Sequence, residues 1–428
     1  MIQGIIFSFY LGTLPVFLIE KGALLSDIAI IHLSALPFSF KLIFAPFLDI
    51  YYSNSFGKRK SYIVPANYFL SFILIGLSFD IEDLIASQQL KFLTFFGILS
   101  IFLLAIQDIA ADGMGADIFI GEKSIYASLA QTIGISLGTL ISSHVLVQLN
   151  SKTFCNRFFY FEEKNEGILK ISHFLCFLGV SLFLVNLYIH KFLNEAKVSQ
   201  EKERISLKES ILSMKAFFLN PSLICFLCFL IISRFTFCFL DSSFKLQLIQ
   251  KGFPKEDFSN IFLLMLFAGI FFQTLLPKFL KKTSEIKLFY FVTFCKLLEN
   301  VISLILIETY SNEYHNSYIF WCFLILVCAT SHLHHNISYG IMASFYNRIS
   351  HTFFSGFEAT SIAFLTSFGN FGKRMTDVLS LSIIEKFDFK VLVVTGWLMG
   401  GGFLLFVRQK ILDLENRMSK EIDKRKAD

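Results

Sequence analysis

The sequence predicts an all-α polytopic membrane protein with about twelve transmembrane helices. Of its 428 residues, 54% are hydrophobic and only 17% are charged, and the mean hydropathy is +0.62. A soluble domain cannot bury so much apolar surface, because its interior fills before all of these side chains are covered. Apolar stretches of roughly 19 residues, the length that crosses a bilayer as a helix, also recur along the whole chain.

These apolar stretches define the predicted spans. In the first half of the chain they fall at 2–20, 26–52, 61–79, 91–118, 124–149 and 168–193. In the second half they fall at 216–241, 257–279, 286–308, 316–345, 353–373 and 388–408. Polar residues interrupt the stretches between 91 and 149, so the hydropathy signal is weakest for the two spans predicted there.

One long charged stretch, from Asn194 to Lys215, separates six predicted spans from the other six. Two six-helix bundles are the architecture of the major facilitator superfamily, in which the bundles rock about a site near the bilayer midplane. We therefore predict an N-terminal bundle at 1–194, a cytosolic linker at 195–215, a C-terminal bundle at 216–411 and a charged cytosolic tail at 412–428.

The distribution of lysine and arginine predicts the orientation in the membrane. More of the 38 basic residues lie in loops on the side of the N-terminus than on the opposite side, which predicts that both termini are cytosolic. The first apolar run lacks a basic leader and a small-residue cleavage site, so we expect it to stay as the first span. In the tail, Lys424 and Lys426 resemble a dilysine retrieval address of the endoplasmic reticulum, or else form part of a solvated charged tail.

Several function classes are disfavoured. The formal net charge of +5 is small for this length and argues against a nucleic-acid partner. Cys225 and Cys228 have CxxC spacing but lie in a predicted span among apolar residues, so we expect no metal. A phosphate-binding GxxxxGK[ST] sequence is absent from the chain, which argues against ATP hydrolysis, and we expect no cofactor.

Charged residues inside spans are costly in lipid and therefore indicate functional positions. Asp108 and Asp112 lie one helical turn apart and project from one face, so a cation must lie near them or one must be protonated. Arg234 and Asp241 share a face of the seventh span. In a six-plus-six transporter the fourth and seventh spans both line the cavity, so these two faces would confront each other, either as a substrate site or as an ion-pair lock.

The loop after the second span contains a second group of candidates. Asp49 ends the span and is followed by Gly57, Lys58, Arg59 and Lys60. An aspartate followed by glycine and basic residues resembles the superfamily's motif between its second and third spans. Such a group can latch the two bundles through charge pairs and a helix-end dipole.

Longer motifs resemble a particular family, the acetyl-coenzyme A transporters of the endoplasmic reticulum membrane. The resemblance begins with Pro46–Asp49 and the following Phe56–Pro65, and continues in Gln107–Gly113, which is similar to the family's Q-D-I-A-V-D-G-W. It extends through Tyr126–Ser128, Gln131, Gly134, Gly138, Phe154–Asn156, Lys245–Leu246, Gly252–Glu256 and Ile341–Ala343. It departs at Met114, where the family has Trp, and at Gly372-Lys373-Arg374, where the family has N-W-P after a glycine pair.

The resemblance implies alternating-access transport of acetyl-CoA from the cytosol into the lumen, where it supplies acetylation. The residues expected to bind substrate or to gate are Lys41, Gln107, Asp108, Asp112, Arg234, Asp241 and Lys245. Acetyl-CoA carries about four negative charges and calls for fixed cations, whereas the spans contain more carboxylates than cations. Either several acids are paired or protonated, or the charged end of the ligand lies near Lys41, Arg234 and Lys245.

Other readings stay open. The same fold could carry a CoA-like or nucleotide metabolite or a muropeptide-like amino sugar. A multispan acyltransferase that uses the polar run Ser331–Asn336, with His335 as base, is a weaker alternative, so the protein is not expected to be an enzyme. The expected partners are acetyl-CoA and the lipid bilayer, and a homodimer is left open.

Overall fold

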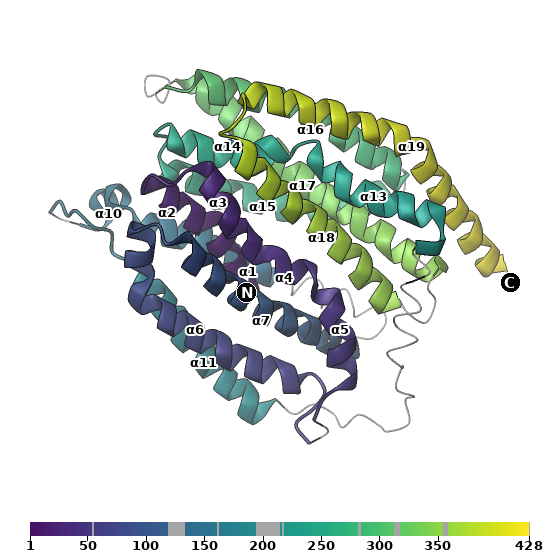
Figure 1. Cartoon of the computed structure of the whole chain (residues 1–428), viewed down its shortest axis with the longest axis horizontal. Coiled ribbons are helices and arrows are strands. Elements are labelled where there is room, and N and C mark those ends of the chain that lie inside the picture. Colours follow the sequence, from purple (N-terminus) through teal and green to yellow (C-terminus); the bar gives the residue numbers. More distant parts are fainter. Residues whose placement is uncertain are drawn as a thin grey trace. The chain divides into compact units, whose positions relative to one another are not determined.

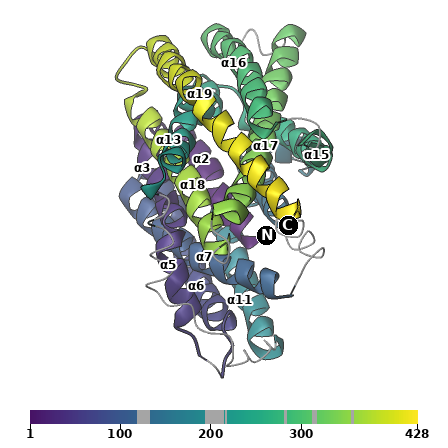
Figure 2. The ribbon, with the colours of Figure 1, turned by 90° about the vertical axis from the view of Figure 1, so that its right-hand side faces the viewer.

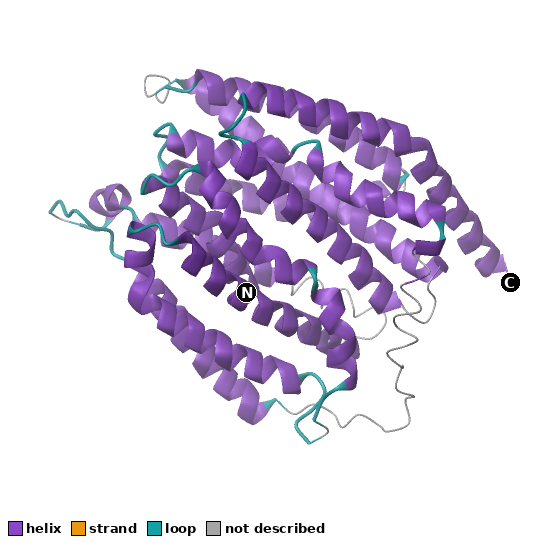
Figure 3. Ribbon diagram, in the orientation of Figure 1, coloured by secondary structure: helices purple, strands orange, loops and turns teal. Residues whose placement is uncertain are grey.

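The computed structural model describes residues 1–53, 55–118, 133–160, 162–193, 215, 218–280, 284–311, 317–353 and 358–427. These residues form helices and connecting loops, and no strand occurs among them (Figure 3). The chain divides into two compact units. Unit 1 comprises Met1–Ile205 with Pro254–Asn260, and unit 2 comprises Ser206–Phe253 with Ile261–Asp428.

Unit 1 contains the helices of the first half of the chain (Figure 1). The first two spans are built from short consecutive pieces: α1 Ile2–Ser8, the π-helical η1 Phe9–Thr13, α2 Leu14–Glu20, α3 Leu25–His32, the 3-10 turn η2 Leu33–Ala35, α4 Leu36–Ser39 and α5 Lys41–Ile50. The later helices are α6 Lys60–Ala86, α7 Leu90–Ile118, the π-helical η4 Ile141–Leu146, α9 Val147–Asn150, α10 Lys152–Phe158 and α11 Ile171–Phe192. Pro15 and Pro37 lie in the first turns of α2 and α4, where proline's missing N–H interrupts the helical hydrogen-bond ladder.

Small and polar residues hold the helices of unit 1 together. A Cβ atom at Gly138 would lie 2.7 Å from the backbone nitrogen of Ile5, so only glycine permits this close approach of the fifth span to α1. The hydroxyls of Ser8 and Ser143 lie 2.5 Å apart in the same region. The α6 and α11 helices run side by side (Figures 1 and 2), joined by Asn186, which is fully buried and donates to the carbonyl oxygen of Val64 at 2.9 Å.

Unit 2 contains α13 Pro221–Phe235, α14 Cys238–Gln250, most of α15 Lys255–Leu280, α16 Glu285–Thr309, α17 Tyr318–Phe353, α18 Glu358–Ile383 and α19 Phe389–Ala427. Two of these helices begin at side-chain caps: Asn220 accepts from the backbone of Ser222 at 3.0 Å, and Ser284 accepts from that of Lys287 at 3.2 Å, as expected for helix N-termini. The α13 helix packs against α18 and α19, and α16 packs against α17. Figure 2 shows α16 and α17 adjacent.

The predicted fold class is confirmed. Among the described residues, nine helices are long and apolar enough to cross a membrane, and α6, α15 and α18 occupy the remaining predicted spans. Several boundaries differ from prediction: α6 continues to Ala86, α14 to Gln250, α17 to Phe353 and α19 to Ala427, and α18 covers Glu358–Ile383. Charged side chains such as Lys and Glu are good helix formers, so these helices extend beyond their apolar stretches. The predicted linker at 195–215 lies outside the described residues except for Lys215.

Candidate functional site

Lys41 and Asp108 form a buried ion pair in unit 1. Lys41 is the first residue of α5, and its Nζ lies 2.9 Å from Oδ2 of Asp108 in α7. The two side chains are only 14% and 4% exposed, so the ammonium is the counter-charge that a carboxylate inside a span requires. Beside it, Oε1 of Gln107 is buried and has no hydrogen-bond partner among the described atoms. The side chain of Asp112 lies outside the described residues, so its expected position opposite Arg234 stays a prediction.

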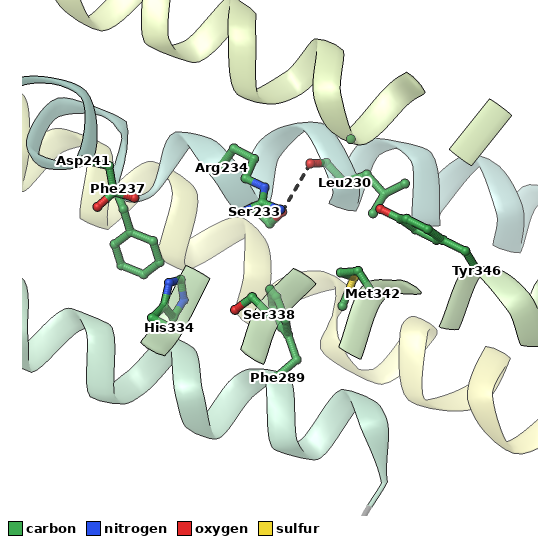
Figure 4. Close-up of a pocket in the computed structure, with 11 residues that line it drawn as sticks. Leu230, Ser233, Arg234, Phe237, Asp241, Phe289, His334, Ser338, Met342 and Tyr346 are labelled. Atoms are coloured by element: carbon green, nitrogen blue, oxygen red, sulfur yellow. Dashed lines mark hydrogen bonds between the residues drawn. The ribbon is translucent and has the colours of Figure 1, made fainter. Parts of the chain in front are cut away.

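A small pocket in unit 2 contains Arg234 and Asp241, two of the residues expected at a binding site (Figure 4). Its lining comes from α13, α14, α16, α17 and α18 and consists of Leu230, Ser233, Arg234, Phe237, Asp241, Phe289, His334, Ser338, Met342, Tyr346 and Gly369. The cavity volume is about 30 Å³, enough for about two water molecules. It can therefore receive one functional group of a large solute but cannot enclose the solute.

Lys296 links the pocket to a buried carboxylate. Its Nζ lies 3.0 Å from Oδ1 of Asp241 and 2.5 Å from Oε2 of Glu299, and it donates to the hydroxyl of Ser331 at 2.8 Å. Lys296 and Glu299 are 3% and 5% exposed, whereas the side chain of Asp241 is 42% exposed. Asp241 therefore has an ion-pair partner from α16 that sequence spacing did not indicate.

Lys373 and Arg374 are charged residues of unit 2 that lie at the predicted end of the eleventh span and directly after it, and the sequence did not select them as site residues. The predicted eleventh span ended at 373, but α18 runs from Glu358 to Ile383, so both cations lie inside the helix. Lys373 is within electrostatic range of Arg234, and both act on His335 in α17. Arg374 pairs with Asp377 at 3.5 Å. The signal that could have revealed them is the Lys373-Arg374 pair itself, directly after a glycine.

Gly372 sets the distance between α18 and α13 and thereby the position of Lys373. A Cβ atom at Gly372 would lie 2.7 Å from the Cα of Ile231 in α13. We expect Gly372→Ala to destabilise the protein by about 1–3 kcal/mol, because the added methyl forces the two helices apart. A thermal melt of the detergent-solubilised protein measures this. Gly401→Ala in α19, where a Cβ meets nothing within 4 Å, is the control. Equal melting temperatures for both variants would contradict the close contact.

Lys245 lies on α14 and is half-buried. Among the described residues, Arg234, Lys245 and Lys373 take part in no direct ion pair. Other cations inside the spans, such as Lys41, Lys296 and Arg374, are paired with carboxylates. Arg234, Lys245 and Lys373 therefore supply positive charge without a directly paired carboxylate in the described part of unit 2, and positive charge is what an anionic solute requires.

The candidate latch residues lie around the start of α6. Gly57 has a positive φ of 104°, a conformation that glycine adopts without strain. Lys60 is buried and donates to the carbonyl oxygen of Leu193, at the end of α11, at 2.8 Å, where a cation is favourable to the helix dipole. Lys58 lies 5.8 Å from the ring of Tyr52. The side chain of Asp49 is outside the described residues, so the latch stays a prediction.

The remaining candidates are placed as follows. Of the polar run on α17, Ser331 is held by Lys296 and His334 lines the pocket. No group of three or more His, Cys, Asp or Glu side chains suited to a metal occurs among the described residues. The backbone of α19 continues through Lys424 and Lys426, but their side chains are not described.

Comparison with known proteins places the chain in a family. Residues 1–216 match the acetyl-coenzyme A transporter 1 family. The chain belongs to this family. An uncharacterized protein of Schizosaccharomyces pombe is 32% identical to this chain over 191 residues, and an uncharacterized membrane protein of Saccharomyces cerevisiae is 31% identical over 206. Each match covers 44% of this chain and only 37% of the fungal protein.

More distant similarities support the same fold. The anhydromuropeptide permease of Escherichia coli K12 is 24% identical over 141 residues, covering 33% of this chain and 28% of the permease. The crystal structure of the nucleoside transporter NupG is 13% identical and matches with a TM-score of 0.62 over 96% of both chains. A bacterial homologue of the lysosomal transporter Spinster is 12% identical, with a TM-score of 0.56 over 98% of this chain and 94% of the other. The chain is thus a multi-pass membrane protein with the major facilitator fold.

Proposed function

We propose that the protein carries acetyl-CoA from the cytosol into the lumen of the endoplasmic reticulum by alternating access. In this proposal the bundles at 1–194 and 216–411 open the substrate path alternately to the cytosol and to the lumen, and both termini face the cytosol. Membership of the acetyl-coenzyme A transporter 1 family supports the cargo. The observation that carries the proposal is the set of three intraspan cations without direct ion-pair partners among the described residues of unit 2.

Pairing of the acids supports an anionic cargo. Lys41 neutralises Asp108, Lys296 contacts both Asp241 and Glu299, and Arg374 pairs with Asp377, a carboxylate outside the predicted spans. The excess of carboxylates in the sequence therefore does not make the pocket uniformly acidic, because protein cations contact most of those that the structure describes. The side chains of Asp112, Asp117 and Glu358 lie outside the described residues.

Arg234, Lys245 and Lys373 are suited to phosphate groups. A guanidinium binds phosphate through two parallel hydrogen bonds, and an ammonium binds it as a point charge. Because Arg234 lines a pocket that admits only a small group, we propose that it contacts one phosphate of acetyl-CoA. Lys373, within electrostatic range of Arg234, would contribute to the same anion site.

Uptake into vesicles tests the proposal. Purified protein reconstituted into liposomes should accumulate labelled acetyl-CoA at a saturable rate. Unlabelled acetyl-CoA and CoA should compete with the label, whereas free acetate and uncharged nucleosides should not, because they lack the phosphates that the cations would bind. Protein that exchanges another solute in the same vesicles, yet takes up no acetyl-CoA, would overturn the proposed cargo.

A second candidate is a carrier of muropeptide-like amino sugars. The similarity to the anhydromuropeptide permease favours it, although that match covers 33% of this chain. Competition decides between the two candidates. If an anhydromuropeptide reduces uptake more strongly than CoA does, the second candidate is correct. If CoA is the stronger competitor, the acetyl-CoA proposal stands.

A further inference from the structure

The contacts of Lys296 form a three-residue ion cluster with unequal charge. Oxygen atoms of Asp241, Glu299 and Ser331 lie at 3.0, 2.5 and 2.8 Å from Nζ, so the ammonium group is surrounded by two carboxylates and one hydroxyl. Glu299 Oε1 also accepts from the hydroxyl of Ser303 at 2.7 Å. With both carboxylates ionised, one cation faces two anions, and the cluster has a net charge of −1.

The cations around this cluster, Arg234 and Lys373, lie on its Asp241 side. The α16 helix, which bears Lys296 and Glu299, packs against α14, α17 and α19. The titratable groups that interact with the cluster are Cys328 and His334 from α17, Cys238 from α14, and Lys373 from α18, whose charge acts on Asp241. Lys245 of α14 acts on Cys328, and Arg234 of α13 acts on His334. Within the described part of α19, no charged group acts on Glu299. Among the described residues, Glu299 thus shares its only cation, Lys296, with Asp241. A buried carboxylate without a cation of its own is costly inside a span, and binding one proton removes that charge.

The two ends of the cluster have different environments. Glu299 is buried, with a side-chain exposure of 5%, whereas Asp241 is 42% exposed and lines the pocket together with Arg234. Lys296 connects them directly. A change in the charge of Glu299 therefore changes how far Lys296 neutralises Asp241. That in turn changes the electrostatic energy of any anion bound beside Arg234, because Asp241 lines the same pocket.

From this geometry we propose that Glu299 is a proton-binding site that couples proton movement to anion transport. A proton converts the Glu299 carboxylate into a carboxylic acid, so that Lys296 neutralises Asp241 alone. The pocket then presents Arg234 without an opposing net negative charge, and an anion binds more tightly. By linkage, a bound anion favours the proton equally. Proton and anion therefore cross together, and the proton leaves Glu299 on the far side.

Gradient-driven uptake tests this coupling. This experiment depends on the proposed acetyl-CoA transport only because labelled acetyl-CoA is the solute whose uptake is measured. In proteoliposomes with the membrane potential clamped, an inwardly directed proton gradient should increase the initial uptake rate of the wild-type protein about tenfold. Glu299→Gln should abolish the gradient effect but retain exchange of external labelled for internal unlabelled acetyl-CoA. Asp241→Asn should also abolish the effect, because Lys296 and ionised Glu299 then balance without a proton.

Glu308→Gln is the matched control, since Glu308 is on the same helix, is 40% exposed and pairs with Lys390 at 3.2 Å. It should respond to the gradient as the wild-type protein does. Wild-type uptake that ignores the gradient while exchange proceeds would overturn the coupling and leave the transport proposal intact. Absence of both uptake and exchange would instead contradict the acetyl-CoA cargo.

If the protein does not carry acetyl-CoA, the proton site can still be tested by a measurement that needs no solute. Infrared difference spectra of the purified protein between neutral and acidic pH should show a carboxylic-acid band that Glu308→Gln retains and Glu299→Gln loses. If Glu299→Gln does not fold, Asp241→Asn should shift the band to lower pH, because Lys296 then stabilises ionised Glu299 alone. A wild-type spectrum without such a band, or a band that Glu299→Gln retains, would overturn the proposal.

Discussion

Lys41→Met is expected to lower the free energy of unfolding by about 3–5 kcal/mol, because it leaves a buried carboxylate without its cation. Asp108 is 4% exposed and its Oδ2 lies 2.9 Å from the Nζ of Lys41. The methionine occupies similar volume, so the loss measures the uncompensated charge more than a cavity. Unfolding of the detergent-solubilised protein by heat or denaturant provides the measurement.

Two further variants separate charge from packing in this result. Lys41→Met combined with Asp108→Leu removes both charges and should recover most of the stability, since a buried ion pair replaced by apolar side chains is often tolerated. Lys390→Met breaks the pair with Glu308, in which the side chains are 59% and 40% exposed, and should change stability by at most about 1 kcal/mol. If Lys41→Met matched Lys390→Met, Asp108 would not depend on Lys41 for its charge.

Arg234→Ala and Lys373→Ala should each reduce the affinity for acetyl-CoA roughly tenfold to a hundredfold, the usual effect of losing a hydrogen bond to a charged group. Neither side chain takes part in a direct ion pair among the described residues, so its removal strands no carboxylate partner. Stability should therefore change much less than in Lys41→Met. Saturation curves of initial uptake rate give the effect.

Arg408→Ala is the matched control for these two variants. Arg408 belongs to α19 of the same unit, is exposed, and lies 5.6 Å from the ring of Tyr290 without lining the pocket. Its removal should leave the affinity for acetyl-CoA unchanged. An equal loss in Arg408→Ala would mean that overall positive charge, and not the pocket, determines affinity.

Hydropathy predicted most of the fold because apolar length is a local property of the chain. The predicted span at 91–118 corresponds to α7, Leu90–Ile118. Hydropathy did not predict the interruptions of the first two spans or the extension of α19 to Ala427, because helix ends depend on propensity and tertiary packing as well as on apolar length.

The site was less predictable, since ion-pair partners are set by tertiary structure. Sequence spacing selected Asp108 and Asp241 as functional carboxylates but did not pair them with Lys41 and Lys296, which come from other helices. Lys373 was not selected because the predicted eleventh span ended at this residue, which made it look like a charge at the membrane surface. In the structure α18 continues for about three more turns, to Ile383. A carboxylate or ammonium inside a span is visible in sequence, whereas its counter-charge is visible only in the folded helices.

Equilibrium binding of acetyl-CoA to the purified protein tests the central claim most directly, because it measures recognition of the anion without requiring a transport cycle. Titration should show saturable binding to the wild-type protein, weakened in Arg234→Ala and in Lys373→Ala and unchanged in Arg408→Ala. CoA should compete, and pantetheine, which lacks the phosphates, should compete poorly. Acetyl-CoA that does not bind, or that binds equally well when Arg234 and Lys373 are both alanine, would contradict the account.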